Sequence, residues 1–401
     1  MADNIRTLLF STLYPSSVRP NHGIFVETRL RHLLASGAIE TRVVAPVPWF
    51  PLAWPTFGEY ALHAAAPRQE TRNGISVDHP RYLLLPKIGM NLAPTALARS
   101  GLAAARRLIA EGFDFDLIDA HYYYPDGVAA VEIGRALGKP TVITARGSDI
   151  NLIAEYPAPR RMILGAAKEC AATITVSAAL KARMEALGAE SAKIHVLRNG
   201  VDLDLFCPTD RQRARTEFGI SRFALASVGN LVSNKGHDLV IRAMTDLPDA
   251  ELLIAGRGTA ETALRELAAR EGVADRVKFV GLLPQERLVT LYAAVDALVL
   301  ASAREGMPNV ILEAMACGTP VVASSVGGIP EVVSSEEGGT LIGNPSVESI
   351  VDGVVRLRQT CPARADVRRH AERFGWDMAT QGQLSIFRKL RGKSLMEACR
   401  A

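Results

Sequence analysis

The chain has 401 residues, of which 48% are hydrophobic and 22% are charged, close to the composition of an ordinary soluble protein. This composition excludes a wholly disordered chain and allows two or three domains with sizeable cores. The formal net charge of +4 is too small to argue for nucleic-acid binding. It is compatible with an acidic small substrate or with an anionic membrane surface.

Cysteine usage and the N-terminus predict a cytosolic protein. The five cysteines are far apart and show no C-x-x-C spacing, so we expect neither a disulfide framework nor a zinc site; they are Cys170, Cys207, Cys317, Cys361 and Cys399. Asp3 stands where a secretory signal would be positively charged, and the apolar run Thr7–Phe10 is too short for one. Prolines between Val43 and Gly58 exclude a membrane helix there, so contact with a membrane is expected to be peripheral.

Short apolar or β-branched runs alternate with amphipathic segments along the chain. In the first half, strands are predicted at Ile5–Phe10, Thr41–Ala45, Asp116–Ala120, Thr141–Thr144, Thr173–Val176 and Ile194–Leu197, and helices at Phe25–Ala35, Pro94–Glu111, Val128–Leu137 and Ala178–Leu187. In the second half, strands are predicted at Phe223–Val228, Glu251–Ala255, Val277–Val280, Ala297–Leu300 and Pro320–Ala323, and helices at Gly236–Met244, Glu261–Glu271, Gln285–Ala294, Pro308–Cys317 and Trp376–Leu390. This alternation is typical of parallel sheets covered by helices on both faces.

So many strands favour two doubly wound α/β domains rather than one sheet. We place the boundary after the strand Ile194–Leu197, which gives domains over residues 1–198 and 199–375. The pattern leaves open whether the last helix, within residues 376–401, completes the second domain or crosses back to the first. Open α/β sheets bind ligands at the carboxyl ends of their strands, so we expect a cleft between the domains lined by the loops after strands.

The strongest motif is the block from Glu305 to Glu313, which follows a predicted strand and opens a helix. Pro308 suits the first helical position, and Gly318 suits the position after the last turn. Backbone N–H groups near the helix start then form an anion site reinforced by the helix dipole, in a stretch comprising Gly306, Met307, Pro308, Asn309 and Val310. Glu305 and Glu313 could hold hydroxyls at two points of a long ligand; the alternative is a solvated helix with two incidental acids.

Two glycine-containing loops follow strands of the second domain. In Gly229–Gly236, Lys235 would offer a point charge to a phosphate at a helix N-terminus, and the alternative is a turn with an exposed lysine. The loop lacks the Gly-Lys-Ser/Thr ending of a Walker motif. Gly256–Gly258 lacks the last glycine of a dinucleotide motif, because Glu261 stands there. By itself this loop is a plain turn, but in a cleft Arg257 could reach a phosphate.

The first domain has three candidate loops where a doubly wound sheet binds ligands: Asn21–Gly23, His121–Gly127 and Arg146–Asp149. His121 could carry a proton, or it could simply be hydrogen-bonded. The three tyrosines after it form either core or a wall on which a sugar stacks. Arg146 stays protonated, so we expect it to bind hydroxyls or phosphate, with Asp149 as a hydroxyl acceptor or ion-pair partner.

Two Asp-x-Asp pairs are present, Asp114/Asp116 and Asp202/Asp204. The first pair precedes its strand and so lies at the wrong end of the sheet, and the second falls in the link between the domains. We interpret both as structural. A metal-bridged nucleotide site is therefore not expected, and we predict neither a metal nor a cofactor.

With these motifs the chain resembles glycosyltransferase family 4, a family of retaining sugar-nucleotide transferases with the GT-B fold. The block Glu305–Glu313 is similar to the family's E-x7-E motif, Gly229–Gly236 to its G-R-x-x-x-x-K-G loop, Asn199–Asp202 to its interdomain stretch, and Gly23 to its N-terminal glycine loop. The resemblance implies that Lys235 contacts the nucleotide diphosphate, that Glu305 and the following amides hold the donor sugar, and that Glu313 holds the ribose. It also implies that the last helix crosses back to the first domain.

Two positions depart from the family pattern. Asn230 replaces the arginine of the phosphate loop, which removes a positive charge that Arg257 could supply. Arg146 replaces the histidine of the family's H-G-x-D turn, which leaves no histidine role at that turn. The run His121–Gly127 is also similar to that of bacterial family-4 enzymes that build surface polysaccharides.

The leading hypothesis is a metal-independent glycosyltransferase that moves a sugar, with retention, from a UDP- or GDP-sugar to a hydroxyl of a carbohydrate or lipid-linked acceptor. A sugar-nucleotide epimerase on the same architecture is the alternative. Two other classes are disfavoured. A non-catalytic sugar binder of the periplasmic type should carry a signal peptide, which we do not expect here. A nicotinamide dehydrogenase should carry G-x-G-x-x-G after its first strand, where this sequence lacks it. A C-terminal basic group could touch anionic lipid, or it forms a solvated helix face; it comprises Arg388, Lys389, Arg391 and Lys393.

Overall fold

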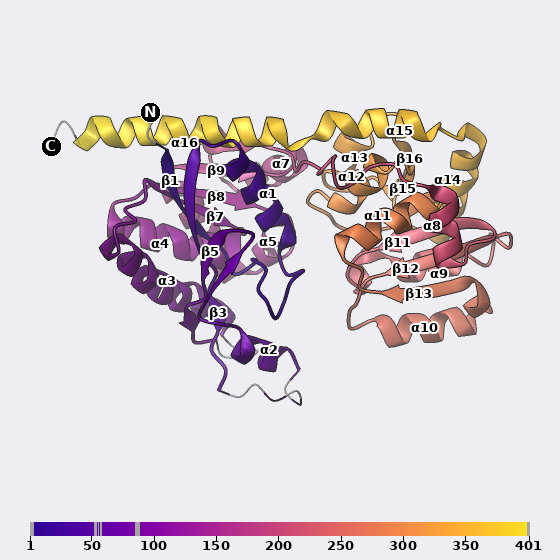
Figure 1. The fold of residues 1–401 in the computed structure, drawn as a ribbon, viewed down its shortest axis with the longest axis horizontal. Helices are drawn as coiled ribbons and strands as arrows, with labels where there is room; N and C mark the ends of the chain where they lie inside the picture. Colours follow the sequence, from indigo (N-terminus) through magenta and orange to yellow (C-terminus); the bar gives the residue numbers. More distant parts are fainter. Residues whose placement is uncertain (1–3, 52–53, 55, 57, 85–88, 399–401) are drawn as a thin grey trace. The chain divides into compact units, whose positions relative to one another are not determined.

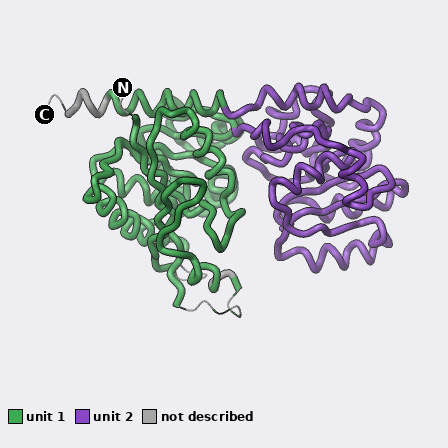
Figure 2. Tube along the Cα trace, viewed as in Figure 1, with its two compact units in different colours: residues 1–198, 377–401 green, residues 199–376 purple. Residues whose placement is uncertain are grey.

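The computed structural model describes residues 4–51, 54, 56, 58–84 and 89–398. The chain forms two compact units, each with its own sheet and covering helices (Figure 1). Unit 1 contains Met1–Arg198 together with Asp377–Ala401, and unit 2 contains Asn199–Trp376 (Figure 2). The chain is therefore an α/β protein with two Rossmann-like units.

Unit 1 holds an eight-stranded sheet in the order β10-β9-β8-β7-β1-β2-β5-β4, in which β4 and β5 are antiparallel and the other neighbours are parallel. Its strands are β1 (Ile5–Phe10), β2 (Ile39–Val44), β4 (Gln69–Arg72), β5 (Ile75–Asp78), β7 (Leu117–His121), β8 (Thr141–Ala145), β9 (Ala172–Thr175) and β10 (Ile194–Val196). A separate short pair joins β3 (Val47–Pro48) and β6 (Arg81–Tyr82). The central strands are nearly continuous apolar runs because both faces of the sheet are covered.

Helices pack on both faces of this sheet, and the alternation of β1 shows how. Leu9 belongs to a buried cluster with Leu30 of α1 and Phe387 of α16. The next residue, Phe10, points to the opposite face, where it lies against Gly101 of α3. The helices of unit 1 are α1 (Ile24–Ala35), α2 (Glu59–Ala65), α3 (Ala93–Ala110), α4 (Val128–Leu137), α5 (Ser148–Asn151), α6 (Pro157–Glu169), α7 (Ala178–Ala186) and α16 (Trp376–Ala398).

The last helix, α16, is part of unit 1 from Asp377 onward. Leu384, Ile386 and Phe387 are buried in the same cluster as β1 and α1. Such burial stabilises the helix by roughly 1.5–3 kcal/mol for each large apolar side chain. This placement answers the question that the sequence pattern left open. Among the described residues, none of the helices is both long and apolar enough to cross a membrane.

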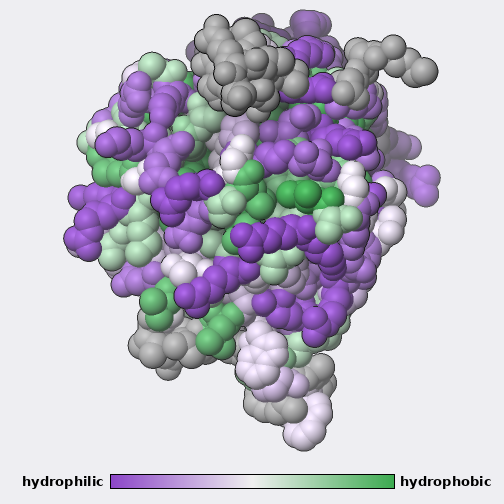
Figure 3. Space-filling model, turned by 90° about the vertical axis from the view of Figure 1, so that its left-hand side faces the viewer, coloured by the Kyte–Doolittle hydropathy of each residue, from purple (hydrophilic) through white to green (hydrophobic). Residues whose placement is uncertain are grey.

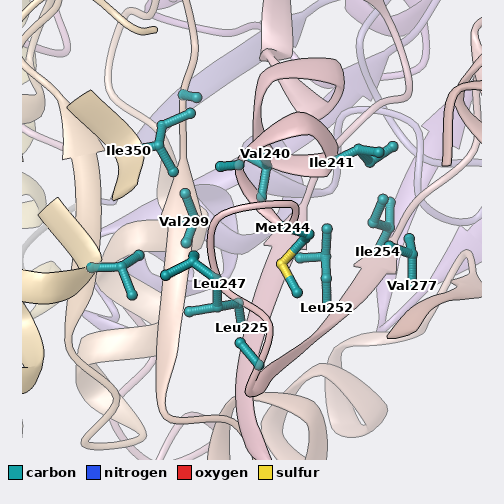
Figure 4. Packing of buried hydrophobic residues seen from close by; sticks show 14 of the residues in the cluster. Leu225, Val240, Ile241, Met244, Leu247, Leu252, Ile254, Val277, Val299 and Ile350 are labelled. Carbon is teal, nitrogen blue, oxygen red and sulfur yellow. The ribbon is translucent and has the colours of Figure 1, made fainter. Parts of the chain in front are cut away.

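Unit 2 holds a parallel six-stranded sheet in the order β13-β12-β11-β14-β15-β16. Its strands are β11 (Phe223–Val228), β12 (Ala250–Ala255), β13 (Val277–Gly281), β14 (Ala297–Leu300), β15 (Val321–Ser324) and β16 (Gly339–Ile342). Its helices are α8 (Arg211–Phe218), α9 (His237–Ala243), α10 (Glu261–Arg270), α11 (Gln285–Ala294), α12 (Asn309–Ala316), α13 (Ile329–Val332), α14 (Val347–Thr360) and α15 (Arg364–Ala371). On one face, Val240 of α9, Met244 directly after α9 and Ile350 of α14 pack against Leu225 and Val299 of the sheet (Figure 4).

Each sheet has a point where the strand order reverses, and in open α/β sheets ligands bind at this point. In unit 2 the chain builds β11, β12 and β13 in one direction and then starts again on the other side of β11 with β14. In unit 1 the corresponding neighbours are β1 and β7. Loops that leave such neighbouring strands diverge and leave a crevice at their carboxyl ends. The loops after β11, β14, β1 and β7 are therefore the structural candidates.

Candidate active site

In unit 2, the predicted lysine loop and the predicted glutamate block meet at the reversal point. The loop Gly229–Gly236 follows β11, and Glu305 follows β14. The amide of Ala303 donates a hydrogen bond of 3.0 Å to the Asn234 carbonyl, which joins the two loops. Gly236 has a φ of +68°, and a Cβ there would stand 2.1 Å from the carbonyl oxygen of Ala301. Glycine at 236 therefore permits the close backbone approach that brings Lys235 to the block.

Lys235 and Glu305 form an ion pair at this junction. The Lys235 Nζ lies 2.5 Å from Glu305 Oε1, and the two side chains are 22% and 10% exposed. Lys235 ends a 3₁₀ turn directly before α9. The ammonium group is thus held in place by a carboxylate and remains reachable from solvent. A mostly buried pair of this kind tolerates loss of both charges better than loss of one.

The glutamate block folds as an extended turn followed by α12. Pro308 has extended backbone angles and caps the helix, so the prediction that it occupies the first helical position is wrong by one residue, and the helix begins at Asn309. Gly306 and Met307 are buried, and the Gly306 carbonyl accepts a 2.9 Å hydrogen bond from the Gly328 amide. These contacts fix the path of the backbone toward the helix start, where Asn309 and Val310 are half-buried.

Glu313 lies one turn into α12 and is half-buried. Tyr292 of α11 donates a 3.0 Å hydrogen bond to Glu313 Oε2. Burial raises the pKa of the Glu313 carboxyl to about 7, because the single phenol bond offsets only part of the desolvation cost. Glu313 is therefore poised between its neutral and charged forms near neutral pH.

The interdomain stretch packs onto this block within unit 2. The Asn199 side-chain amide donates a 2.9 Å hydrogen bond to Asn309 Oδ1, and its backbone N–H points to the Met307 sulfur at 3.3 Å. Val201 forms a bridge with Gly375, so the segment that enters unit 2 and the segment that leaves it lie side by side. Sequence reasoning identified the stretch but missed its contact with the start of α12.

Asn230 and Arg257 lie on adjoining loops of unit 2. The amide of Leu231 donates a 3.0 Å hydrogen bond to the carbonyl of Arg257, which holds the loop after β12 against the loop after β11. Both side chains are exposed. The structure therefore places the Arg257 side chain on the same group of loops as Asn230, as compensation for the missing arginine requires.

In unit 1, Asp126 ties the loop after β1 to the turn after β7. Its Oδ2 accepts hydrogen bonds from the Thr12 amide at 3.0 Å and the Thr12 hydroxyl at 2.9 Å. Burial raises the pKa of the Asp126 carboxyl to about 7. Gly23 closes the same β1 loop at the start of α1 with a φ of +69°, and a Cβ there would stand 2.3 Å from the Leu13 carbonyl oxygen. The glycine loop is thus required by packing.

His121 is the last residue of β7, and it is buried. An Arg146 guanidinium nitrogen lies 2.6 Å from His121 Nδ1, and His121 Nε2 lies 3.3 Å from Asp119 Oδ2. Since a guanidinium only donates, Nδ1 accepts and Nε2 carries the proton. Burial, together with the Arg146 charge, lowers the pKa of His121 to about 4 against the opposing effect of Asp119. The geometry favours a neutral, hydrogen-bonded histidine over a proton carrier.

The buried polar chain continues to the last helix. Gln383 of α16 donates a 2.8 Å hydrogen bond to Asp119 Oδ2 and accepts one of 2.6 Å from Arg29 Nε of α1. Arg29, Asp119 and Gln383 were not predicted as functional. The spacing of Asp119 and His121 could have revealed one of them, because residues two apart at the end of a strand point to the same face. Nothing in the sequence around Arg29 or Gln383 marks either as buried.

The remaining predicted residues of unit 1 shape its loops. The Asp149 carboxylate accepts hydrogen bonds from the backbone amides of Tyr123, Arg146 and Gly147, at 2.7 Å in the shortest cases. Asp149 therefore organises the loop backbone around Arg146. Tyr123 and Tyr124 are buried, so these two tyrosines are core.

The Asp-x-Asp pairs have local partners. Asp114 pairs with Lys139, Asp116 accepts a hydrogen bond from the Arg6 amide, and Asp202 accepts hydrogen bonds from the amides of Asp204 and Leu205. Within the described ranges, no three His, Cys, Asp or Glu side chains gather as a group that could hold a metal ion.

Two family models match this chain. Residues 209–374 match the model described as Glycosyl transferases group 1, and residues 56–205 match the model described as Glycosyltransferase Family 4. Similar proteins include the D-inositol 3-phosphate glycosyltransferases of Mycobacteroides abscessus, 39% identical over 209 residues, and of Mycobacterium marinum, 37% identical over 219 residues. These matches cover 50% and 51% of this chain and 47% of each relative, so the chain matches about half the length of these curated relatives.

Solved structures with the same fold cover nearly the whole chain. Sucrose-phosphate synthase from Thermosynechococcus elongatus has a TM-score of 0.81 at 18% identity, covering 98% of this chain and 100% of that one. Anabaena HepE in complex with UDP and glucose has a TM-score of 0.73 at 20% identity, covering 96% of this chain and 99% of that one. At these identities the likeness establishes the fold. The fold is GT-B, and the two family models show that the chain belongs to glycosyltransferase family 4.

Proposed function

We propose that this protein transfers a sugar, with retention of configuration, from a UDP- or GDP-sugar to a hydroxyl of a carbohydrate or lipid-linked acceptor, in surface polysaccharide or glycolipid assembly. The observation that carries the proposal is the Lys235–Glu305 pair at the reversal point of unit 2. A held cation beside a helix start suits a diphosphate, and a carboxylate suits sugar hydroxyls. The complex of Anabaena HepE with UDP and glucose adds support for this class of donor.

The donor-side roles follow from charge and position in unit 2. Lys235 and the amides at the start of α12 stabilise the leaving diphosphate, and Arg257 adds charge to the same group of loops. Glu305 binds hydroxyls of the donor sugar, and Glu313 binds the ribose. These fixed cations and dipoles supply the stabilisation for which other transferases use a metal ion, so we propose a metal-independent reaction.

Retention is proposed to occur at one face of the donor without a covalent enzyme intermediate. Glu305 is held by an ammonium group 2.5 Å away, which lowers its nucleophilicity. The developing negative charge then lies on the leaving phosphate, where Lys235 neutralises it.

Unit 1 is proposed to bind the acceptor. A pocket of about 180 Å³ opens at the ends of β1, β2 and β5, and its lining includes Thr12, Arg19, His22 and Tyr82. Its size suits one sugar or cyclitol ring, and its basic side chains suit a phosphate or a polarised hydroxyl. The name of the matched relatives makes D-inositol 3-phosphate a candidate to test. Arg146, held by His121, is proposed to bind hydroxyls or phosphate in the same unit.

A contact of the last helix with anionic lipid at the cytoplasmic membrane face also stays a proposal. Arg388 and Lys389 are exposed on α16. Arg391 approaches Asp116 to 3.6 Å, which neutralises part of the basic group. The side chain of Lys393 lies outside the described residues.

A thermal-shift screen with UDP-, GDP- and ADP-sugars tests the donor, because a ligand that binds only the folded chain raises its melting temperature. The stabilising donor is then incubated with and without acceptors, among them D-inositol 3-phosphate. A transferase releases free nucleotide that depends on acceptor and yields a product with the donor's anomeric configuration. Conversion of the donor sugar without acceptor would instead establish the epimerase, and inversion would contradict the retaining mechanism.

A further inference from the structure

One edge of unit 1 exposes large apolar side chains that a soluble domain normally buries. Trp49 is 55% exposed, Leu83 61%, Met90 41% and Leu92 64%. We call these four residues the apolar rim. They lie just after β3, just after β6 and just before α3. In the space-filling view, green groups are scattered among purple side chains, and some of them lie near the lower end of this face (Figure 3).

The segments that carry the apolar rim lie beside one another. The amide of Trp49 donates a 2.7 Å hydrogen bond to the carbonyl of Tyr82, which places Trp49 beside the chain entering Leu83. Leu83 and Leu92 line one groove of about 570 Å³. The Met90 carbonyl accepts a 2.5 Å hydrogen bond from the buried Tyr124, which anchors the turn before α3. The backbone at Trp49 and at Met90 is therefore fixed by hydrogen bonds to the fold beneath it.

The charged side chains that line the groove of the apolar rim are both basic. Arg81 and Arg99 line the same groove as Leu83 and Leu92, and Arg106 is exposed two turns further along α3. The sequence from 79 to 110 contains no Asp or Glu, and its basic residues are Arg81, Lys87, Arg99, Arg106 and Arg107, of which Arg107 pairs with Asp78 and Glu111. In a chain with 46 basic and 42 acidic residues, such a stretch is strongly biased. Its complement is a surface that is both apolar and negatively charged.

We propose that the apolar rim docks this protein onto an anionic lipid bilayer. A Trp with neighbouring Leu and Met side chains inserts at the boundary between headgroups and acyl chains, where an amphipathic ring is favoured. Arg81 and Arg99 lie beside the inserted side chains and bind the lipid phosphates. This surface is separate from the basic group on α16, and the binding does not depend on the proposed sugar transfer.

The apolar rim also adjoins the pocket proposed for the acceptor. Pro48 and Tyr82 line that pocket, and Trp49 and Leu83 are the next residues along the chain. A docked rim would thus hold the pocket entrance at the headgroup level. This arrangement favours, within the proposed function, an acceptor whose polar head is carried by a lipid.

Co-sedimentation of the full chain with vesicles tests the proposal, using phosphatidylcholine alone and phosphatidylcholine mixed with phosphatidylglycerol. We expect sedimentation with the anionic vesicles only, weakened by added salt. Arg99→Glu should lower partitioning by roughly fivefold or more, since each basic residue near an anionic surface contributes about that factor. Leu83→Glu and Leu92→Glu should each lower it by roughly tenfold or more, because each loses inserted apolar surface and adds a repelled charge.

Matched controls come from exposed positions of unit 2. Leu282→Glu is the control for Leu83→Glu and Leu92→Glu, because the Leu282 side chain is 49% exposed. Arg270→Glu is the control for Arg99→Glu, because Arg270 is also exposed. Both controls should keep full vesicle binding, and all variants should keep their melting temperatures. The proposal is wrong if the wild-type chain stays in the supernatant with both vesicles. It is also wrong if Leu83→Glu still sediments with the anionic vesicles while the double variant Arg388→Glu/Lys389→Glu does not, because the basic group on α16 would then be the binding surface. A wild-type dimer that does not bind vesicles and that Leu83→Glu dissociates would likewise contradict the proposal.

Whether sugar transfer fails is a separate question. Transfer to a water-soluble acceptor should be unchanged in Leu92→Glu, because Leu92 lies outside the donor loops and does not line the pocket proposed for the acceptor. A chain that binds vesicles but transfers no sugar would refute the proposed function and leave the docking intact.

Discussion

Replacing Lys235 by Ala should remove most of the catalytic rate while leaving the fold in place. The Lys235 ammonium is 2.5 Å from Glu305, and both side chains are largely shielded from water. The substitution therefore has two consequences in the donor site. It removes a cation from the leaving diphosphate, and it takes the ammonium neighbour away from the Glu305 carboxylate close to that diphosphate.

The magnitude can be estimated from these two effects. Two unit charges about 4 Å apart interact by about 4 kcal/mol at the effective dielectric constant of a protein surface region, and solvent and mobile counterions reduce this. Loss of one positioned electrostatic stabiliser typically costs about 10²–10³ in rate. We expect Lys235→Ala to lose at least 10²-fold in kcat, and Lys235→Arg to lose less because its charge remains. Lys235→Ala combined with Glu305→Gln should lose less than the product of the single effects, because the two residues interact directly and the double variant loses that interaction only once.

The assay is release of nucleotide from a saturating donor in the presence of acceptor, with melting temperatures measured on every variant. Lys278→Ala is the matched control, because Lys278 also pairs with a glutamate in unit 2, at 2.8 Å from Glu251, yet lies on β13 away from the candidate loops. Lys278→Ala should keep its rate. Undiminished turnover of Lys235→Ala at saturating donor would refute the leaving-group role, and an equal loss in Lys278→Ala would show that the effect comes from general damage to unit 2.

Four further predictions concern the same site. Glu305→Gln should lose most turnover while nucleotide still raises the melting temperature, and equal loss of nucleotide binding would contradict its assignment to the sugar. Glu313→Ala should weaken nucleotide binding; loss of turnover with unchanged nucleotide affinity would contradict its assignment to the ribose. The pKa of the Glu313 carboxyl is raised from 4.5 to about 7, so its ionisation costs stability as the pH rises from 4.5 to 7. Above pH 7, Glu313→Gln should therefore be more stable than wild type, by at most about 3 kcal/mol in chemical denaturation. Below pH 4.5 this gain should be absent. Activity should survive exhaustive chelation with EDTA; inactivation restored by Mn²⁺ or Mg²⁺ would overturn the metal-independent mechanism.

The sequence predicts the central strands well because both faces of each sheet are buried. β1 is predicted with its observed bounds, and β11 likewise, since both are short apolar runs flanked by polar residues. The edge strand β4 was not predicted, because Gln69–Arg72 is polar and pairs with only one neighbour. Helix α14 was also missed, although Ser346 and Ser349 form a capping box at its start. Capping residues and edge strands carry their signal in a few atoms, which hydrophobic periodicity does not record.

The candidate site divides along the same line. The loops that carry the candidate site could be predicted, since ligands bind at the carboxyl ends of parallel strands. The side-chain pairings could not, because they join residues far apart in the sequence, such as Lys235 with Glu305 or Asp119 with Gln383. Arg29 illustrates the limit: it is fully buried, whereas an arginine within a helix is ordinarily assigned to the surface.

Arg146 offers the sharpest separation of function from structure in unit 1. Burial lowers the pKa of its guanidinium to about 9, against the attraction of Asp119 and Asp149. A base whose pKa is lower in the folded chain holds its proton less well there, so below pH 9 the charged Arg146 costs stability. A residue retained at such a cost is a candidate for binding substrate rather than for holding the fold. Its guanidinium is fixed by His121 Nδ1 at 2.6 Å and by the ring of Phe25, whose centroid is 5.0 Å away.

Arg146→Ala should therefore lower kcat/KM by about 10²-fold or more and leave the melting temperature equal to or above that of wild type. His121→Ala should lower kcat/KM less, because it loosens the guanidinium without removing it, and Arg146→Lys should recover only part of the activity, because a lysine lacks the planar fork. In Arg146→Ala the pKa of His121 should rise from about 4 toward its ordinary value, since the Arg146 charge is one of the causes that lower it, and NMR titration of the imidazole measures this directly. A purely structural arginine predicts the reverse, a clear fall in melting temperature with little change in the rate of the folded fraction. Measuring both quantities on Arg146→Ala decides between the two roles.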